Sequence, residues 1–195
     1  MIDPETAKIA PANERGDFLR VIKPCMKYRE SFIRAEDENI AANIYEFTRL
    51  SPDERASESG FSSYIRKLED YRRGFRLPNG YVPSSSFWLV DEDKEEFIGQ
   101  ASIRHFMTES LKTFGGHIGY AIRPSFWNKG YGTAQLALLL PEAKKLGINL
   151  VRLTCYASNT ASSRIMEKNG GKRIREIISN INGVDTAVWI YEIEN

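Results

Sequence analysis

Two closely spaced glycines beside a lysine are the residues best suited to hold an anionic group. The segment Arg123–Ala134 reads Arg-Pro-Ser-Phe-Trp-Asn-Lys-Gly-Tyr-Gly-Thr-Ala and leads into a Leu/Ala-rich helical pattern. The first turn of a helix has N–H groups without intrahelical partners, and its dipole favours negative charge. Gly130 and Gly132 keep side chains away from that backbone, and Lys129 adds a cation. The segment predicts a phosphate-binding loop.

The two common nucleotide fingerprints do not match this loop. A Walker loop places its lysine after the second glycine, whereas Lys129 precedes Gly130 here. A dinucleotide fingerprint needs a third small residue where this chain has Gln135. Both departures disfavour a nucleotide-binding domain.

The loop resembles the acetyl-coenzyme A loop of the GCN5-related N-acetyltransferases, the GNAT superfamily. That family's pattern is Gln/Arg-x-x-Gly-x-Gly/Ala at the start of a helix. Here both glycines match, while Trp127 departs from the first position. The resemblance implies that backbone amides of the loop bind the pyrophosphate of the coenzyme. The residues implied are Asn128, Lys129, Gly130, Tyr131, Gly132 and Thr133.

The stretch before the loop is rich in glycine and reads as a strand. Alternation predicts one face made of Gly116, Ile118, Tyr120 and Ile122, and an opposite face made of Gly115, His117, Gly119 and Ala121. Glycine inside a strand marks a bulge, a tight sheet contact or the close approach of a ligand. In GNAT proteins pantetheine lies against the corresponding strand. The resemblance therefore implies backbone contacts at Ala121, Ile122 and Arg123.

A third motif, Asn159-Thr160-Ala161-Ser162, resembles the family's Asn-x-x-Ser/Ala helix start. The resemblance implies that Asn159 and Ser162 lie beside the pantetheine arm, although Asn at this place is also an ordinary N-cap. Many family members have a Tyr seven residues after the Asn as the acid for the leaving thiolate, but this chain has Met166. Tyr120, another hydroxyl such as that of Ser125, or water must then serve, unless the thiolate needs no acid.

Acetylation of an amine also requires a neutral nucleophile. A lysine-like amine has a pKa of about 10.4 and is almost fully charged near pH 7, so a base helps to remove its proton. His117 is our first candidate for this catalytic base, because histidine titrates in the useful range. His105 is the second candidate, and we expect it to lie near the substrate. The alternative for each is a structural histidine of the sheet.

Composition gives the broad class. The chain has 195 residues, a net charge of +1, 42% hydrophobic residues and 27% charged residues, as a globular protein does. We expect no nucleic-acid partner, no membrane span and no signal peptide. Cys25 and Cys155 lack a disulfide framework, so we expect a cytoplasmic protein. The spacing of the Cys and His residues gives no metal site.

The order of the predicted elements is that of the GNAT fold. We expect a loose tail over 1–16 and one domain over 17–195, with an acceptor-side helical segment over 24–76 and the core sheet over 84–193. Strands are predicted at Phe18–Ile22, Ser86–Val90, Glu96–Met107, Lys112–Ile122, Leu150–Cys155, Lys172–Ile178 and Val184–Ile193. Helices are predicted at Phe61–Phe75, Gly130–Leu146 and Thr160–Lys168, with a kink at Pro141.

The resemblance implies an α/β fold with a single mixed, mostly antiparallel sheet, splayed at the acetyl-CoA site and covered by helices on both faces. It implies an N-acetyltransferase that moves acetyl from acetyl-CoA to a primary amine by direct attack in a ternary complex. The acceptor is a small molecule or a peptide, and the protein is a monomer or homodimer. The alternative is a non-catalytic acyl-CoA-binding or sensor module.

Overall fold

Two antiparallel sheets form the framework of the protein. The computed structural model describes residues 18–44, 50–181 and 183–195. The expected tail over 1–16 lies outside these residues. The first sheet has the order β1 (Leu19–Ile22), β2 (Ser84–Asp91), β3 (Glu96–Arg104) and β4 (Ile118–Ile122). The second has the order β5 (Leu150–Tyr156), β7 (Val184–Glu194) and β6 (Lys172–Ile181).

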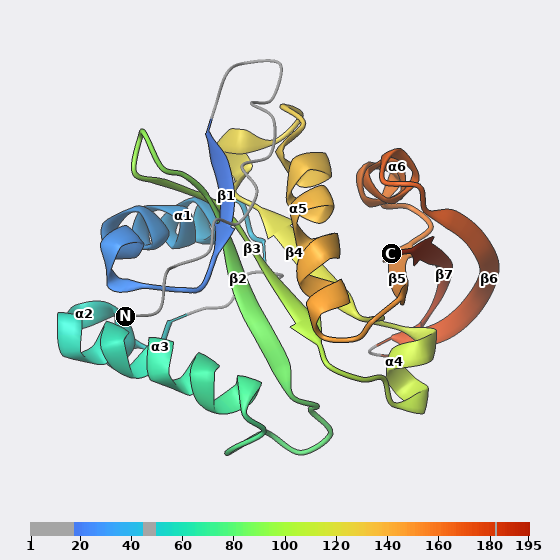
Figure 1. Cartoon of the computed structure of the whole chain (residues 1–195), viewed down its shortest axis with the longest axis horizontal. Helices are drawn as coiled ribbons and strands as arrows, with labels where there is room; N and C mark the ends of the chain where they lie inside the picture. The colour runs from blue at the N-terminus through green and yellow to red at the C-terminus, as the bar shows by residue number, and fades with distance from the viewer. Residues whose placement is uncertain (1–17, 45–49, 182) are drawn as a thin grey trace.

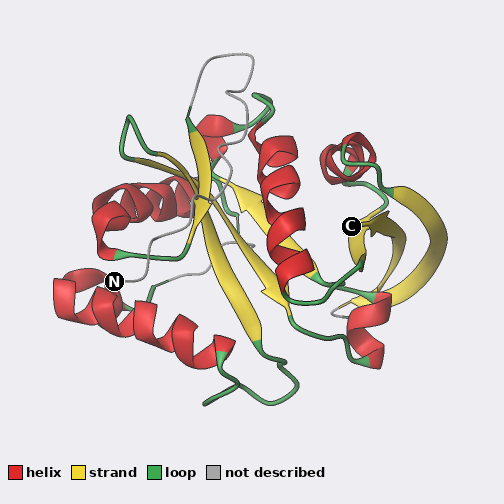
Figure 2. Ribbon diagram, in the orientation of Figure 1, coloured by secondary structure: helices red, strands yellow, loops and turns green. Residues whose placement is uncertain are grey.

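Helices cover both faces of the first sheet, as Figures 1 and 2 show. α1 (Arg29–Ala41), α2 (Pro52–Ala56) and α3 (Glu58–Arg72) lie on one side, and α5 (Tyr131–Lys145) lies on the other. The remaining helical elements are η1 (Met26–Tyr28), α4 (Glu109–Thr113), η2 (Pro124–Phe126) and α6 (Thr160–Lys168). α5 continues past Pro141, and the expected kink stays a prediction.

Alternation along the strands builds a separate core on each face. On the α1/α3 face, Phe32 stacks on Trp88 with ring centroids 4.8 Å apart and meets Phe61 edge-on at 5.8 Å. On the α5 face, Leu136 and Leu139 join a cluster of buried side chains. Its strand members include Phe87, Ala101, Ile103, Ile118, Val151 and Leu153. Because α5 belongs to the second core, it lies on the opposite side of the sheet from α1 and α3.

One predicted strand is wrong over its first half. The stretch expected as a strand from Lys112 contains α4 instead, and β4 starts only at Ile118. Thr108 caps α4, because its Oγ1 accepts a hydrogen bond from the Leu111 backbone N at 3.3 Å. Gly115 and Gly116 then adopt positive φ angles of 115° and 61°, which interrupts extended backbone.

The two sheets are connected where β4 begins. The backbone N of His117 donates to the Arg152 carbonyl at 2.7 Å, and the Gly115 N donates to Thr154 Oγ1 at 2.8 Å. Among the described residues, no strand ladder joins β4 to β5. The expected splay therefore divides the sheet into two, which meet at the start of β4 and part toward Ile122.

Gly116 allows this connection. A Cβ at Gly116 would lie 2.4 Å from the Arg152 carbonyl oxygen and 2.9 Å from the Leu153 Cα. Backbone atoms of β5 cannot move aside without displacing the strand, so a side chain at this position is excluded.

We predict that Gly116→Ala destabilises the protein by about 3 kcal/mol or more, because overpacking adds to left-handed strain. Gly147→Ala is the matched control: its φ is also positive, at 80°, but a Cβ there meets nothing within 4 Å. It should cost only about 1–2 kcal/mol. Urea unfolding measures both, and equal losses would contradict the proposed close contact.

Candidate active site

The predicted phosphate loop opens α5 with its backbone exposed. Gly130 is the N-cap residue and has a φ of 83°, and Asn128 is also left-handed at 56°. The first bond of the helical ladder runs from the Ala134 N to the Gly130 carbonyl at 3.1 Å, so the amides of Gly132 and Thr133 lie ahead of it. A Cβ at Gly130 would meet nothing within 4 Å. This geometry suits an anion held by backbone N–H groups.

The other glycine of the motif has a packing role. A Cβ at Gly132 would lie 2.5 Å from Cδ1 of Ile165 on α6. A side chain at Gly132 would therefore require the Ile165 methyl group to shift, while Gly130 leaves space open to a ligand. The sequence pattern did not separate these two roles, because Ile165 comes from a distant helix.

Aromatic side chains fix the loop against the end of β4. The Phe126 and Tyr131 rings meet edge-on with centroids 5.3 Å apart. The Trp127 indole N–H donates to the Ile122 carbonyl at 2.6 Å. Lys129 Nζ donates to the Ser125 carbonyl at 2.7 Å. Trp127, which departs from the family motif, thus anchors the loop to β4.

Only part of the segment 121–123 turns its backbone toward the opening between the sheets. Arg123 N donates to the Ile98 carbonyl at 2.9 Å, and the register pairs Ala121 with Gln100. In an antiparallel ladder the intervening residue directs its N–H and C=O away from the partner strand. Ile122 therefore offers its N–H to the opening, as does Tyr120. The backbone N–H groups of Ala121 and Arg123 point toward β3. Coenzyme contacts at these two residues, which the resemblance implied, would have to come from atoms other than these N–H groups.

The Arg123 side chain is a structural clamp. It is only 6% exposed and forms ion pairs with Glu38 of α1, at 2.7 Å, and with Glu96 of β3. The Glu38 carboxylate also accepts the Ser125 backbone N at 3.2 Å. The hydrogen bonds from Arg123 and Ser125 hold the pKa of Glu38 below its usual range, although burial opposes them. This network joins the start of the phosphate loop to α1.

Tyr120 spans the opening between β4 and α6. Its hydroxyl lies 2.9 Å from Ser162 Oγ and 3.4 Å from the Ser162 carbonyl. Burial raises the pKa of Tyr120 far above its usual value, so the phenol stays protonated at neutral pH. Asn159 caps α6, because its Oδ1 accepts the Ser162 N at 3.0 Å. The Asn159–Ser162 motif at the start of α6 thus meets β4 through Tyr120.

His117 lies at the sheet connection. Its Nδ1 accepts the Arg152 backbone N at 2.9 Å, so the neutral ring carries its proton on Nε2. Burial, followed by the Arg152 and Arg104 guanidinium groups, lowers the pKa of His117. This ring can accept a further proton only by giving up the bond to Arg152. Its role as the catalytic base stays a prediction.

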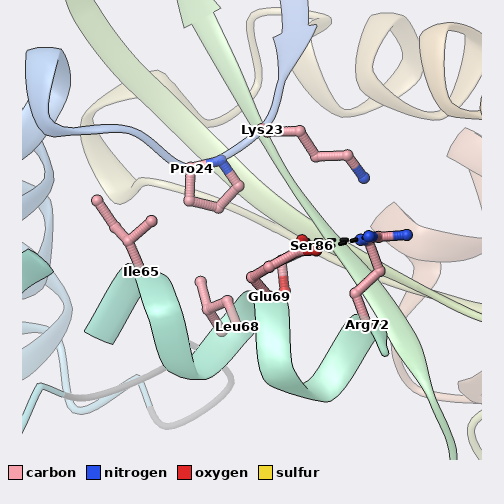
Figure 3. A pocket seen from close by; sticks show the side chains of 7 residues that line it. All are labelled: Lys23, Pro24, Ile65, Leu68, Glu69, Arg72 and Ser86. Atoms are coloured by element: carbon pink, nitrogen blue, oxygen red, sulfur yellow. Dashed lines mark hydrogen bonds and ion pairs between the residues drawn. The ribbon is translucent and has the colours of Figure 1, made fainter. Parts of the chain in front are cut away.

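His105 lies at the end of β3, near β2 and α3. His105 Nε2 is 3.0 Å from Ser85 Oγ on β2. Burial, followed by Arg72 and Lys23, lowers the pKa of His105. Figure 3 shows Lys23 and Arg72 at a cavity of about 70 Å³ between α3 and β2. Arg72 is paired with Glu69 at 2.5 Å, so this cavity has a locally neutralised rim.

The other candidate groups are structural. Met166 is 1% exposed and belongs to the core, so it leaves no room for a hydroxyl from this position of α6. Cys155 is buried, and burial raises its pKa to about 11, which keeps the thiol protonated.

No set of three or more His, Cys, Asp or Glu side chains in the described ranges is arranged to hold a metal ion. No helix within these ranges has the length and apolar composition of a membrane span.

The sequence of this chain matches a known protein family. The family model for the acetyltransferase (GNAT) domain matches residues 31–172. The chain belongs to the GNAT family. It is thus an acyltransferase with acetyl-CoA as co-substrate, as its resemblance to this family implied. A curated relative, the uncharacterized N-acetyltransferase YnaD of Bacillus subtilis (strain 168), is 28% identical over an alignment of 137 positions that covers 67% of this chain and 72% of YnaD.

Solved structures of GNAT acetyltransferases share the fold. The microcin C7 self-immunity acetyltransferase MccE, in complex with acetyl-CoA and AMP, has a TM-score of 0.62 and 19% identity, covering 91% of this chain and 92% of MccE. The ribosomal-protein-S5-alanine acetyltransferase of Vibrio fischeri has a TM-score of 0.65 and 15% identity, covering 91% and 93%. At these identities the similarity concerns the fold.

We predict that His117 acts mainly as the connector between β4 and β5. His117→Ala leaves the buried Arg152 N–H without its acceptor and should cost about 1–3 kcal/mol in urea unfolding. His117→Asn keeps an acceptor oxygen near the Nδ1 position and should recover most of both stability and turnover. If the imidazole is the catalytic base instead, both variants lose turnover equally, since neither amide nor methyl group accepts the proton.

Proposed function

We propose that this GNAT protein transfers acetyl from acetyl-CoA to a primary amine by direct attack in a ternary complex. The observation that carries the proposal is that three features lie between β4, α5 and α6, where no ladder among the described residues joins β4 to β5. They are the open left-handed turn at Gly130, the Ile122 N–H that points away from β3, and the Tyr120–Ser162 bridge.

The donor half of the site would bind the coenzyme through backbone groups. The amides of Gly132 and Thr133 precede the first bond of the helical ladder of α5, and they suit the pyrophosphate. The pantetheine arm would run between β4 and α6, where Ile122 offers its N–H and the exposed Asn159 offers its amide group. MccE was solved with acetyl-CoA, and a RimL ribosomal L7/L12 α-N-protein acetyltransferase was solved with coenzyme A. Both names support this assignment of the donor.

In the reaction, the amine nitrogen forms a bond to the acetyl carbon, and the carbon–sulfur bond breaks. The nitrogen loses one proton, and the departing thiolate gains one. Tyr120 is protonated at neutral pH and lies in the opening, so its hydroxyl is our candidate for the proton donor to sulfur. The proton of the amine passes to water or to His117, and the comparison of His117 variants distinguishes these two routes.

A non-catalytic acyl-CoA-binding module is the second candidate function. Met166 in the position of the family tyrosine favours it, because this helix then supplies no acid. The Tyr120 hydroxyl, which lies beside the same helix, favours the enzyme. Free thiol release from acetyl-CoA in the presence of an amine panel separates the two.

We expect the wild-type protein to release coenzyme A with at least one class of amine, measured with a thiol reagent across peptides, lysine derivatives, polyamines, aminoglycosides and small metabolite amines. Gly130→Ala should weaken coenzyme A binding about tenfold, because a methyl group enters the space beside the amides. Gly170→Ala, with the same left-handed φ of about 82° and open surroundings, is the control and should bind normally. Coenzyme binding without thiol release for any amine would favour the module.

Tyr120→Phe should lower kcat by about 10²-fold or more while the Kd for coenzyme A stays within a few-fold. Tyr191→Phe is the control, because Tyr191 is also a buried phenol, bonded to Ser163 at 3.0 Å, but lies in the core. It should reduce stability and leave kcat unchanged. Steady-state kinetics at pH 7 and 9 measure both variants, and equal effects on kcat would refute the proposed proton transfer.

A further inference from the structure

Arg104 is a half-buried cation at the end of β3, next to the start of β4. Its Nη1 donates to the carbonyls of Gly115 and Gly116, both at 3.0 Å, and these two bonds fix the guanidinium plane. Its Nη2 lies 3.7 Å from the place where a side chain of Gly119 would begin. Burial lowers the pKa of Arg104, and the neighbouring Tyr81 opposes this effect.

This arginine lacks the carboxylate that two other arginines of the site have. Arg123 pairs with Glu38 and Glu96, and Arg152 pairs with Glu192 at 2.5 Å. Within the described part of the chain, no Asp or Glu lies within ion-pair distance of Arg104. A desolvated guanidinium with an open edge is costly unless an anion pairs with it.

The open edge of Arg104 faces the side from which an acceptor would arrive. Ile103 and Ile118 point toward α5, so alternation directs Arg104 and Gly119 to the opposite face. The donor loop belongs to the α5 side. On the opposite face, Ser102 Oγ also lies 3.7 Å from the Cβ position of Gly119, which itself carries no side chain beside the guanidinium.

We infer that Arg104 binds a carboxylate of the acceptor, so that the acceptor is an amine that carries a carboxylate within about one residue of the nitrogen. A guanidinium N–H group and a carboxylate form a charge-assisted hydrogen bond. Since Nη1 is occupied by the glycine carbonyls, Nη2 provides the free donors. The inference depends on the proposed acetyl transfer, because it concerns the second substrate of that reaction.

The test uses matched acceptors: amino acids with their amides, and peptides with Asp or Asn in the second position. Wild type should show kcat/KM about tenfold to a hundredfold higher for the carboxylate form, as expected for a charge-assisted hydrogen bond. Arg104→Gln should raise KM for the carboxylate form until both acceptor forms have about the same kcat/KM. Its kcat/KM for the amide form should stay within a few-fold of the wild-type value. Arg104→Lys, which keeps the charge, should retain part of the ratio. Arg66→Gln, which removes an exposed arginine of α3, is the control and should keep all of it.

A purely structural role for Arg104 gives a different result. Its variants would then lower kcat/KM equally for both acceptor forms and lower the melting temperature, which overturns the inference. Wild type with equal kcat/KM for both forms also overturns it and leaves acetyl transfer intact. No thiol release with any acceptor, despite coenzyme A binding, is the failure of the proposed function itself, and the inference falls with it.

Discussion

The connection between β4 and β5 at His117 and Arg152 is the contact on which the site depends. Two hydrogen bonds, at 2.7 and 2.9 Å, join the strands at one end, and beyond them the strands separate. If the strands paired along their whole length, the N–H groups of Tyr120 and Ile122 would be spent on the ladder. The Gly115 N bond to Thr154 Oγ1 and the shared core of Ile118 and Leu153 also hold the two sheets together at this end. Because the strands are joined only at this end, the backbones of β4 and β5 separate beyond it. The same bonds keep the two strands from moving further apart.

Glycine makes that connection possible, but the glycines of the site act in different ways. Gly116 lets two backbones approach, Gly132 leaves room for the Ile165 methyl group, and Gly130 leaves a space and adopts a left-handed conformation. Only Gly130 leaves space for a ligand at its own Cα. The proposed donor site therefore needs close packing at two of its glycines and ligand access at the third.

Charge divides the site into a neutralised and an unpaired part. Arg123 joins α1, β3 and the phosphate loop through two carboxylates, so its cation is compensated within the fold. Arg104 is held by carbonyl dipoles alone, which supply only part of the lost hydration. His117 lies near Arg104 and Arg152, and their positive field adds to burial in keeping the imidazole neutral.

The family, the glycine turn that opens α5 and most elements could be predicted from the sequence, because these depend on neighbouring residues: glycine spacing, helix caps and alternation. Local signals also misled, since Thr108 and the two glycines after it replaced part of a predicted strand with α4. Contacts between distant residues were decided by the tertiary structure alone. His117 and Arg152 are 35 positions apart, and no local pattern tells whether an imidazole accepts a backbone bond or a substrate proton. Likewise, only packing brings Ile165 to Gly132 and leaves Arg104 without a carboxylate.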